Sequence, residues 1–153
     1  MPLYHYTCEE HHEAIKRDRL LKPGILVASK AGRDRLRRTR ISRITSQLVW
    51  LTTVPHITYL NAGIAGLYTE QMAALVGVKP CNRTAFRWEL TDDKVLIQPW
   101  TVLRERWPAD IVDELESFPQ AQPKTWWVTR GPAKASYSPN HAVRESVPIQ
   151  SSA

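Results

Sequence analysis

The chain has 153 residues, of which 42% are hydrophobic and 24% are charged, with a formal net charge of +6. Such a length is typical of a single domain with its own core, and no apolar run approaches the roughly 18–20 residues that cross a bilayer. The first residues soon become charged and His-rich, which argues against a secretory signal peptide. We therefore expect a cytoplasmic protein with one domain over residues 1–137 and a flexible polar tail over 138–153.

The first predicted strand, LYHYT, begins at Leu3. All five of its residues suit a strand, and the two-residue period places Tyr4 and Tyr6 on one face, with Leu3, His5 and Thr7 on the other. Two interpretations of His5 follow. It is either a structural imidazole bonded to nearby backbone, or a ligand contact at the floor of a cleft.

Residues 8–21, CEEHHEAIKRDRLL, predict a helix. On such a helix Cys8 and His12 share a face, and with His11 beside them a metal site is one interpretation. No second pair with zinc spacing follows, so we prefer a solvated helix face and expect no metal.

The positive charge is concentrated in residues 30–43, which hold seven Lys or Arg against one Asp. Such a stretch suits a phosphate-bearing partner, either a nucleic acid or a dinucleotide, and a solvated basic loop without a partner explains it equally well. The candidate nucleic-acid contacts are its arginines, namely Arg33, Arg35, Arg37, Arg38, Arg40 and Arg43.

Residues 47–55, QLVWLTTVP, give the strongest strand signal in the chain, and their nearly continuous apolar run predicts burial on both faces. Residues 56–76 have a helical pattern that two glycines interrupt. In TAFRWEL, residues 84–90, the alternation places Arg87 and Glu89 on the face opposite the apolar side chains.

Shorter elements follow. Residues 94–100 predict a strand, residues 109–118 a surface helix, and residues 123–131 a last strand on which Trp126 and Trp127 face opposite ways. Strands interleaved with one or two helices, without the spacing of parallel βαβ units, predict an α+β domain around a twisted, mostly antiparallel sheet.

The order of LYHYT, a helix ending in LLKPG, a VWLTT strand and an FRWEL strand resembles that of ADP-ribosyltransferase-like domains. It is similar to the rifampin ADP-ribosyltransferases, the DNA-modifying ADP-ribosyltransferase toxins and the RNA 2′-phosphotransferases of related fold. The resemblance covers residues 3 to 91 and implies the ADP-ribosyltransferase fold, with NAD as the cofactor.

The resemblance also implies roles for single residues. In such families a His or Arg on the first core strand holds the NAD ribose and the nicotinamide amide, and an aromatic ring, often Tyr, stacks on the nicotinamide. An acid on a later strand orients the ribose and supports an oxocarbenium-like transition state. Carried over, His5 and Glu89 become the catalytic candidates. The predicted NAD contacts are His5, Tyr6, Thr7, Trp50, Thr52, Tyr59 and Arg87.

Each role has a structural alternative. Glu89 is alternatively an exposed carboxylate on a strand, paired with Arg87 or Lys94. In that case Glu70 is the next candidate for the catalytic acid. Trp50 and Trp88 suit the core as well as a ligand platform.

The first interpretation is an NAD-dependent ADP-ribosyltransferase that modifies a nucleic acid or another host macromolecule, as a toxin or bacteriophage effector would. The alternative is a non-catalytic module on the same fold that binds nucleic acid or a host protein through the basic stretch and exposed Trp side chains. Release of nicotinamide from NAD separates the two. A third interpretation, a small metalloprotein using Cys8, His11 and His12, predicts bound zinc.

Overall fold

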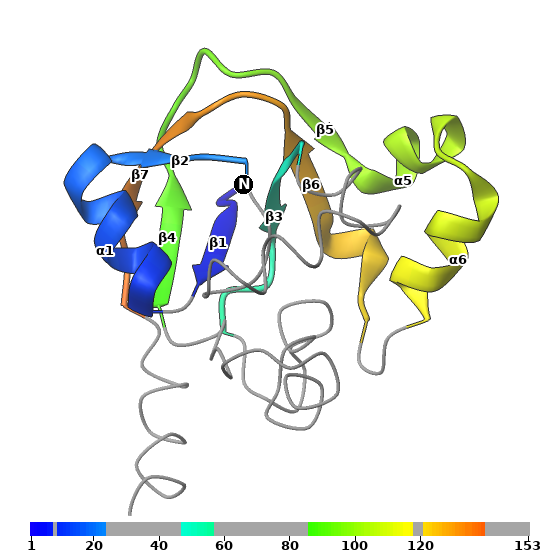
Figure 1. Ribbon diagram of the computed structural model, residues 1–153, viewed down its shortest axis with the longest axis horizontal. Helices are drawn as coiled ribbons and strands as arrows, with labels where there is room; N and C mark the ends of the chain where they lie inside the picture. The colour runs from blue at the N-terminus through cyan, green and yellow to red at the C-terminus, as the bar shows by residue number, and fades with distance from the viewer. Residues whose placement is uncertain (8, 24–46, 57–85, 118–120, 140–153) are drawn as a thin grey trace, which may run out of the picture.

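In the part of the chain that the structure describes, the strand of the LYHYT motif, β1 (Tyr4–Thr7), lies inside a seven-stranded antiparallel sheet whose strand order is β2-β7-β4-β1-β3-β6-β5. Figure 1 shows β1 between β4 and β3. The computed structural model describes residues 1–7, 9–23, 47–56, 86–117 and 121–139.

The elements follow one another as β1, α1 (Glu9–Asp18), β2 (Leu20–Leu21), β3 (Val49–Thr52), β4 (Phe86–Leu90), β5 (Ile97–Pro99), α5 (Trp100–Leu103), the 3-10 turn η3 (Arg104–Arg106), α6 (Ala109–Glu116), the 3-10 turn η4 (Pro123–Thr125), β6 (Trp126–Thr129) and β7 (Ala133–Tyr137). The predicted α+β class with an antiparallel sheet is confirmed, and three α-helices accompany the sheet in the described residues where one or two were expected. No helix among these residues is long and apolar enough to cross a bilayer.

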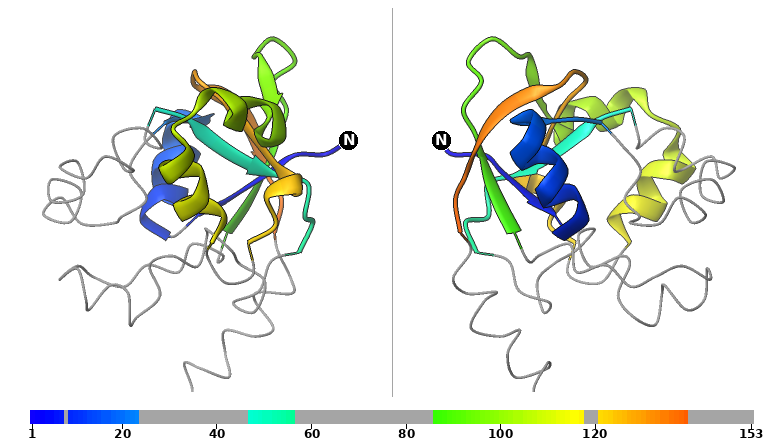
Figure 2. Two further views of the ribbon diagram at one scale, coloured as in Figure 1. Left: turned by 90° about the vertical axis from the view of Figure 1, so that its right-hand side faces the viewer. Right: turned by 60° about the vertical axis from the view of Figure 1, so that its left-hand side comes forward.

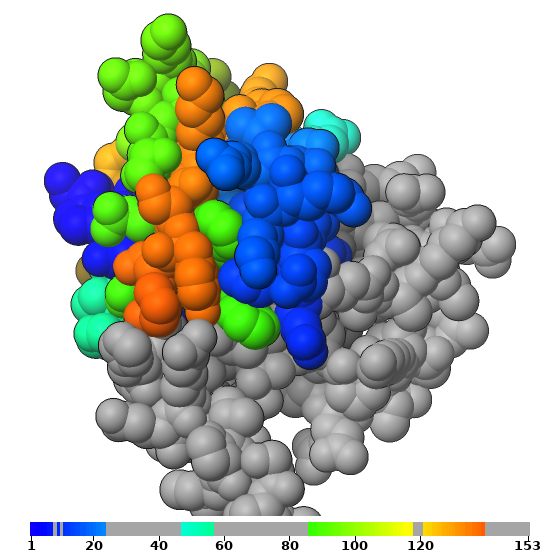
Figure 3. Space-filling model, turned by 90° about the vertical axis from the view of Figure 1, so that its left-hand side faces the viewer, coloured from blue at the N-terminus to red at the C-terminus, as the bar shows by residue number. Residues whose placement is uncertain are grey.

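The helices gather at two ends of the sheet. In Figure 2 the left view places α5 and α6 in front of the strands, and the right view places α1 in front of them. Figure 3 shows β7 running along the surface beside α1.

Each end has its own hydrophobic cluster. One contains Trp100 of α5, three apolar residues of α6 and the inward side chains of β6, Trp126 and Val128. The other joins Ile15 of α1 to Trp88 and Leu51 on the strands.

The two clusters lie on opposite faces of the sheet. We call the sheet face that carries Trp126 and Val128 the α6 face, and the face that carries Trp88 and Leu51 the α1 face. Trp126 and Trp127 belong to different clusters, as their adjacent strand positions predict.

The predicted helix over residues 8–21 was too long at its C-terminal end. The structure ends α1 at Asp18, and Arg19 follows with φ 58°, in the left-handed region that commonly terminates helices. Leu20 and Leu21 then form β2 and pair with Lys134 and Ala133 of β7. The sheet partner, which is remote in sequence, decides the conformation of these two leucines.

Two further predictions were also incomplete. The strand expected over residues 94–100 is shorter, because Pro99 ends β5 and Trp100 begins α5. The strand at 123–131 is not the last one, since β7 follows it and lies between β2 and β4. Small and polar residues make up most of β7, so its sequence carries a weak strand signal.

The α1 end is held by a polar contact inside an aromatic group. The Trp88 indole donates a hydrogen bond to Nδ1 of His12 at 3.1 Å, and His12 stacks on Phe86 with ring centroids 4.0 Å apart. His12 and Trp88 are both buried. Because an indole N–H can only donate, Nδ1 of His12 is the accepting, unprotonated nitrogen.

We predict that Trp88→Phe will lower the free energy of unfolding by about 1–3 kcal/mol more than Trp127→Phe does. Both changes shrink an indole of the same cluster, but only the first deprives a buried imidazole nitrogen of its donor. Urea unfolding of the two variants measures the difference. Equal losses would show that ring volume, and not the hydrogen bond, accounts for the role of Trp88.

Candidate functional site

The sheet is least tightly paired between β1 and β3. Within the described residues the register between these strands consists of one pair, Tyr4 opposite Thr52, whereas β1 and β4 are paired over four consecutive positions from Tyr4 to Thr7. We call this line the β1–β3 seam. A side chain crosses it, because Nδ1 of His5 lies 2.8 Å from the carbonyl oxygen of Trp50.

The seam contact places a proton on Nδ1 of His5, because a carbonyl oxygen only accepts hydrogen bonds. When the ring is neutral, its lone pair then lies on Nε2. His5 is half-buried, and Thr7, two positions along on the same face, is fully buried. The Thr7 hydroxyl has no hydrogen-bond partner in the described structure, an arrangement that costs stability.

Glu89 lies on the opposite face of the sheet from His5. In the ladder of β1 and β4, His5 faces Trp88, and Tyr4 faces Glu89. Residues directly opposite one another project to the same side of a sheet, so His5 lies on the α1 face and Glu89 on the α6 face. The two catalytic candidates are therefore separated by the sheet.

The Glu89 carboxylate is partly exposed and makes no hydrogen bond or ion pair in the described structure, so pairing with Arg87 or Lys94 is not observed. Ser136 of β7 is its neighbour on one side and Tyr4 of β1 on the other.

Arg87 is bound by the main chain of two distant segments. Its guanidinium donates to the Pro55 carbonyl after β3, and to the Ser138 carbonyl and hydroxyl after β7, both at 2.9 Å. It also lies over the Tyr4 ring, 4.6 Å from the centroid. These contacts give Arg87 a structural role, and its predicted role in holding NAD stays a prediction.

The same contacts affect the predicted C-terminal tail. Ser138 and Pro139 both accept hydrogen bonds from Arg87, and the Ser138 amide donates to the Arg87 carbonyl at 2.9 Å. The first two residues of the segment expected to be flexible are thus attached to β4.

Tyr6 is buried beside Arg87, and its hydroxyl donates to the Val54 carbonyl at 2.7 Å. Burial raises the pKa of the Tyr6 phenol well above its ordinary value, against a smaller lowering by the Arg87 charge. The phenol is therefore neutral at physiological pH and holds the segment after β3 against β1.

The remaining predicted NAD contacts on β3 also serve the fold. The ring of Trp50 lies on the α6 face among other tryptophans, with its centroid 5.2 Å from that of Trp100. The hydroxyl of Thr52 donates to the Thr125 hydroxyl at 3.1 Å and accepts from the Val54 amide at 3.2 Å.

Of the predicted contacts that the structure describes, His5 and Thr7 share the α1 face. Those on the α6 face are Tyr6, Trp50, Thr52, Arg87 and Glu89. Tyr59, Glu70 and the arginines between 33 and 43 lie outside the described residues. Among the residues that the structure does describe, no group of three or more His, Cys, Asp or Glu could hold a metal ion.

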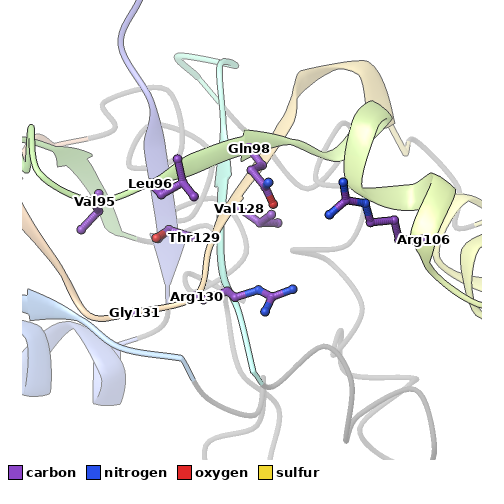
Figure 4. Close-up of a pocket in the computed structure, with 8 residues that line it drawn as sticks. All are labelled: Val95, Leu96, Gln98, Arg106, Val128, Thr129, Arg130 and Gly131. Carbon is purple, nitrogen blue, oxygen red and sulfur yellow. The ribbon is translucent and has the colours of Figure 1, made fainter.

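The sequence did not point to a pocket of about 440 Å³ near β5 and β6. Arg106 of η3, Arg130 after β6 and Gln98 of β5 line it, as Figure 4 shows. In the sequence, Arg106 and Arg130 are two isolated arginines on separate elements. They can be recognised as one site only after the fold brings them together.

Comparisons with protein families, with curated proteins and with solved structures found no match to this chain.

For Arg87 we predict that substitution by Lys will lower the free energy of unfolding by about 1–3 kcal/mol, because an ammonium keeps the charge but not the planar set of donors. Arg106→Lys is the matched control, since Arg106 is exposed and makes no hydrogen bond or ion pair in the described structure. Urea unfolding at neutral pH compares the two. If Arg87→Lys is as stable as the control, the bonds to residues 55, 138 and 139 do not hold the fold.

Proposed function

We propose that this protein is an NAD-dependent ADP-ribosyltransferase whose NAD site lies at the β1–β3 seam. The observation that carries the proposal is the imidazole of His5, which crosses the seam and is fixed by the Trp50 carbonyl at 2.8 Å. A fixed tautomer is what a residue needs when it must present one nitrogen to a ligand in a constant direction.

A hydroxyl of the NAD ribose is a suitable hydrogen-bond donor to Nε2 of His5 in this tautomer. With the proton on Nδ1, the lone pair of Nε2 is an acceptor for a ribose hydroxyl. The buried Thr7 hydroxyl, on the same face, can both donate to and accept from the carboxamide of nicotinamide once the seam widens around the ligand. These two residues would bind and orient NAD for departure of nicotinamide and attack by the acceptor at C1′.

This chemistry also requires an acid. Charge develops at C1′ as nicotinamide departs, and a carboxylate nearby would stabilise it. No strand position of the described α1 face carries a carboxylate, and Glu89 lies on the other face. An acid acting beside His5 would therefore not come from the described strands, and Glu70, which lies outside the described residues, is one candidate.

The acceptor that we propose is a nucleic acid or another host macromolecule. The charge of residues 30–43 supports it, since seven cations against one Asp attract a phosphate-rich partner. The setting that suits such an activity is that of a toxin or a bacteriophage effector.

One observation favours a second function, that of a non-catalytic binding module. The two sequence-predicted catalytic residues do not meet, and Arg87, Thr52 and Tyr6 are engaged in holding the fold. A module of this kind would bind nucleic acid in a salt-dependent manner and leave NAD intact.

The test is nicotinamide release from NAD by three proteins, namely the wild type, His5→Asn and Glu89→Gln. The Asn side chain can still donate to the Trp50 carbonyl but lacks the nitrogen equivalent to Nε2, so it separates binding from folding. We predict that His5→Asn will lower kcat/KM roughly tenfold or more, since a hydrogen bond to the ligand is lost, and that Glu89→Gln will stay within about twofold of the wild type.

The opposite result, a loss of two to three orders of magnitude in Glu89→Gln with His5→Asn unaffected, would move the site to the α6 face and restore Glu89 as the acid. No nicotinamide release by the wild type with any acceptor would favour the binding module. Thermal unfolding of each variant serves as the control for folding.

A further inference from the structure

The pocket lined by Arg106 and Arg130 lies away from the seam, because it borders β5 and β6 and β3 stands between β6 and β1. Its volume, about 440 Å³, falls within the range of small-molecule sites. Figure 4 shows the two guanidinium groups reaching into the same space from η3 and from the end of β6, next to Gln98. Three separate elements thus supply hydrogen-bonding side chains to one cavity.

The charge of this pocket is not balanced from within. None of its lining residues carries a carboxylate, and neither arginine forms a hydrogen bond or an ion pair in the described structure. Two guanidinium groups directed at one space repel each other, and an anion between them would turn that repulsion into attraction. The planar fork of Arg matches the oxygens of a phosphate group better than other cations do.

The position of Arg106 is fixed from behind. Its neighbour in η3, Arg104, forms an ion pair with Glu116 of α6 at 3.0 Å, although the two groups are not aligned as a hydrogen bond. Trp107, at the end of the same turn, packs against Trp100 with ring centroids 5.0 Å apart. These contacts hold the backbone that carries Arg106 at the rim of the pocket, and the guanidinium itself is exposed and available to a ligand.

The other wall is apolar. Val128 is buried at the base of the pocket, and Leu96 at its edge has 77% of its surface exposed. A ligand suited to both walls carries a negative group at one end and an apolar or planar group at the other.

We propose that this pocket binds a small phosphate-bearing molecule, with Arg106 and Arg130 holding the phosphate and Gln98 donating a hydrogen bond to it. The apolar or planar part of the ligand lies against Val128 and Leu96. The proposal does not depend on the activity at the seam, because it uses none of the residues assigned there.

The test uses the full chain and inorganic pyrophosphate as the probe, titrated at low ionic strength. The readout is the nuclear magnetic resonance signal of the Nε–H groups of Arg106 and Arg130, each assigned from its own variant. We expect saturable shifts of both signals, and a loss of affinity of roughly tenfold or more in Arg106→Gln and in Arg130→Gln. Arg106→Lys should weaken binding less than Arg106→Gln, because it keeps the charge alone.

The matched control is Lys16→Gln, which removes one exposed positive charge from α1, at the other end of the sheet. Binding that weakens equally in Lys16→Gln and Arg106→Gln would reduce the effect to general charge attraction and overturn the proposal. It would also be overturned by the absence of saturable shifts at the two arginines. Shifts produced by a single-stranded oligonucleotide but not by pyrophosphate would instead assign the pocket to a polymer.

His5→Asn distinguishes this proposal from the proposed activity. The variant should bind pyrophosphate like the wild type even where its nicotinamide release is lost. A parallel loss of pyrophosphate binding would mean that the pocket is not an independent site.

Discussion

The register between β1 and β4 is the constraint on which the interpretation of this protein depends. Four consecutive residue pairs fix it, from Tyr4 opposite Glu89 to Thr7 opposite Phe86. Since side chains alternate between the faces of a strand, this ladder sends His5 to the side of α1 and Glu89 to the opposite side. The structure thus places the two candidates found from sequence on opposite faces of the sheet.

The faces differ in what their polar groups do. On the α6 face the phenol of Tyr6, the hydroxyl of Thr52 and the guanidinium of Arg87 hold together segments that are distant in sequence. On the α1 face, His5 crosses the weakly paired line between β1 and β3, with the unsatisfied Thr7 hydroxyl two positions away. A place where strand pairing is sparse and polar groups are only partly satisfied is a place where a ligand can bring a gain in free energy.

The sequence predicts what is local and misses what depends on partners. The period-two pattern predicted the faces of β1 and β4 correctly, and the helix predicted over residues 109–118 is α6. The sequence missed β2 and β7, because their short, weakly patterned sequences become strands only through partners remote in sequence: β2 pairs with β7, and β7 pairs with β2 and β4. The separation of His5 from Glu89 was equally out of reach, since a slip of one residue in the register would have placed both on one face. The pocket lined by Arg106 and Arg130 could not be predicted either, because the two arginines come together only in the folded chain.

The most direct test of this account is a measurement of nuclear Overhauser effects from the side-chain methylene protons of Glu89 in the isotopically labelled full chain. Paired positions on one face bring Cβ atoms to roughly 4.5–5.5 Å, close enough for strong effects between neighbouring side chains. The account predicts contacts from Glu89 to the ring protons of Tyr4 and to Ser136, and none to the imidazole of His5. Contacts from Glu89 to His5, with those to Tyr4 absent, would contradict the register and return both residues to a single site.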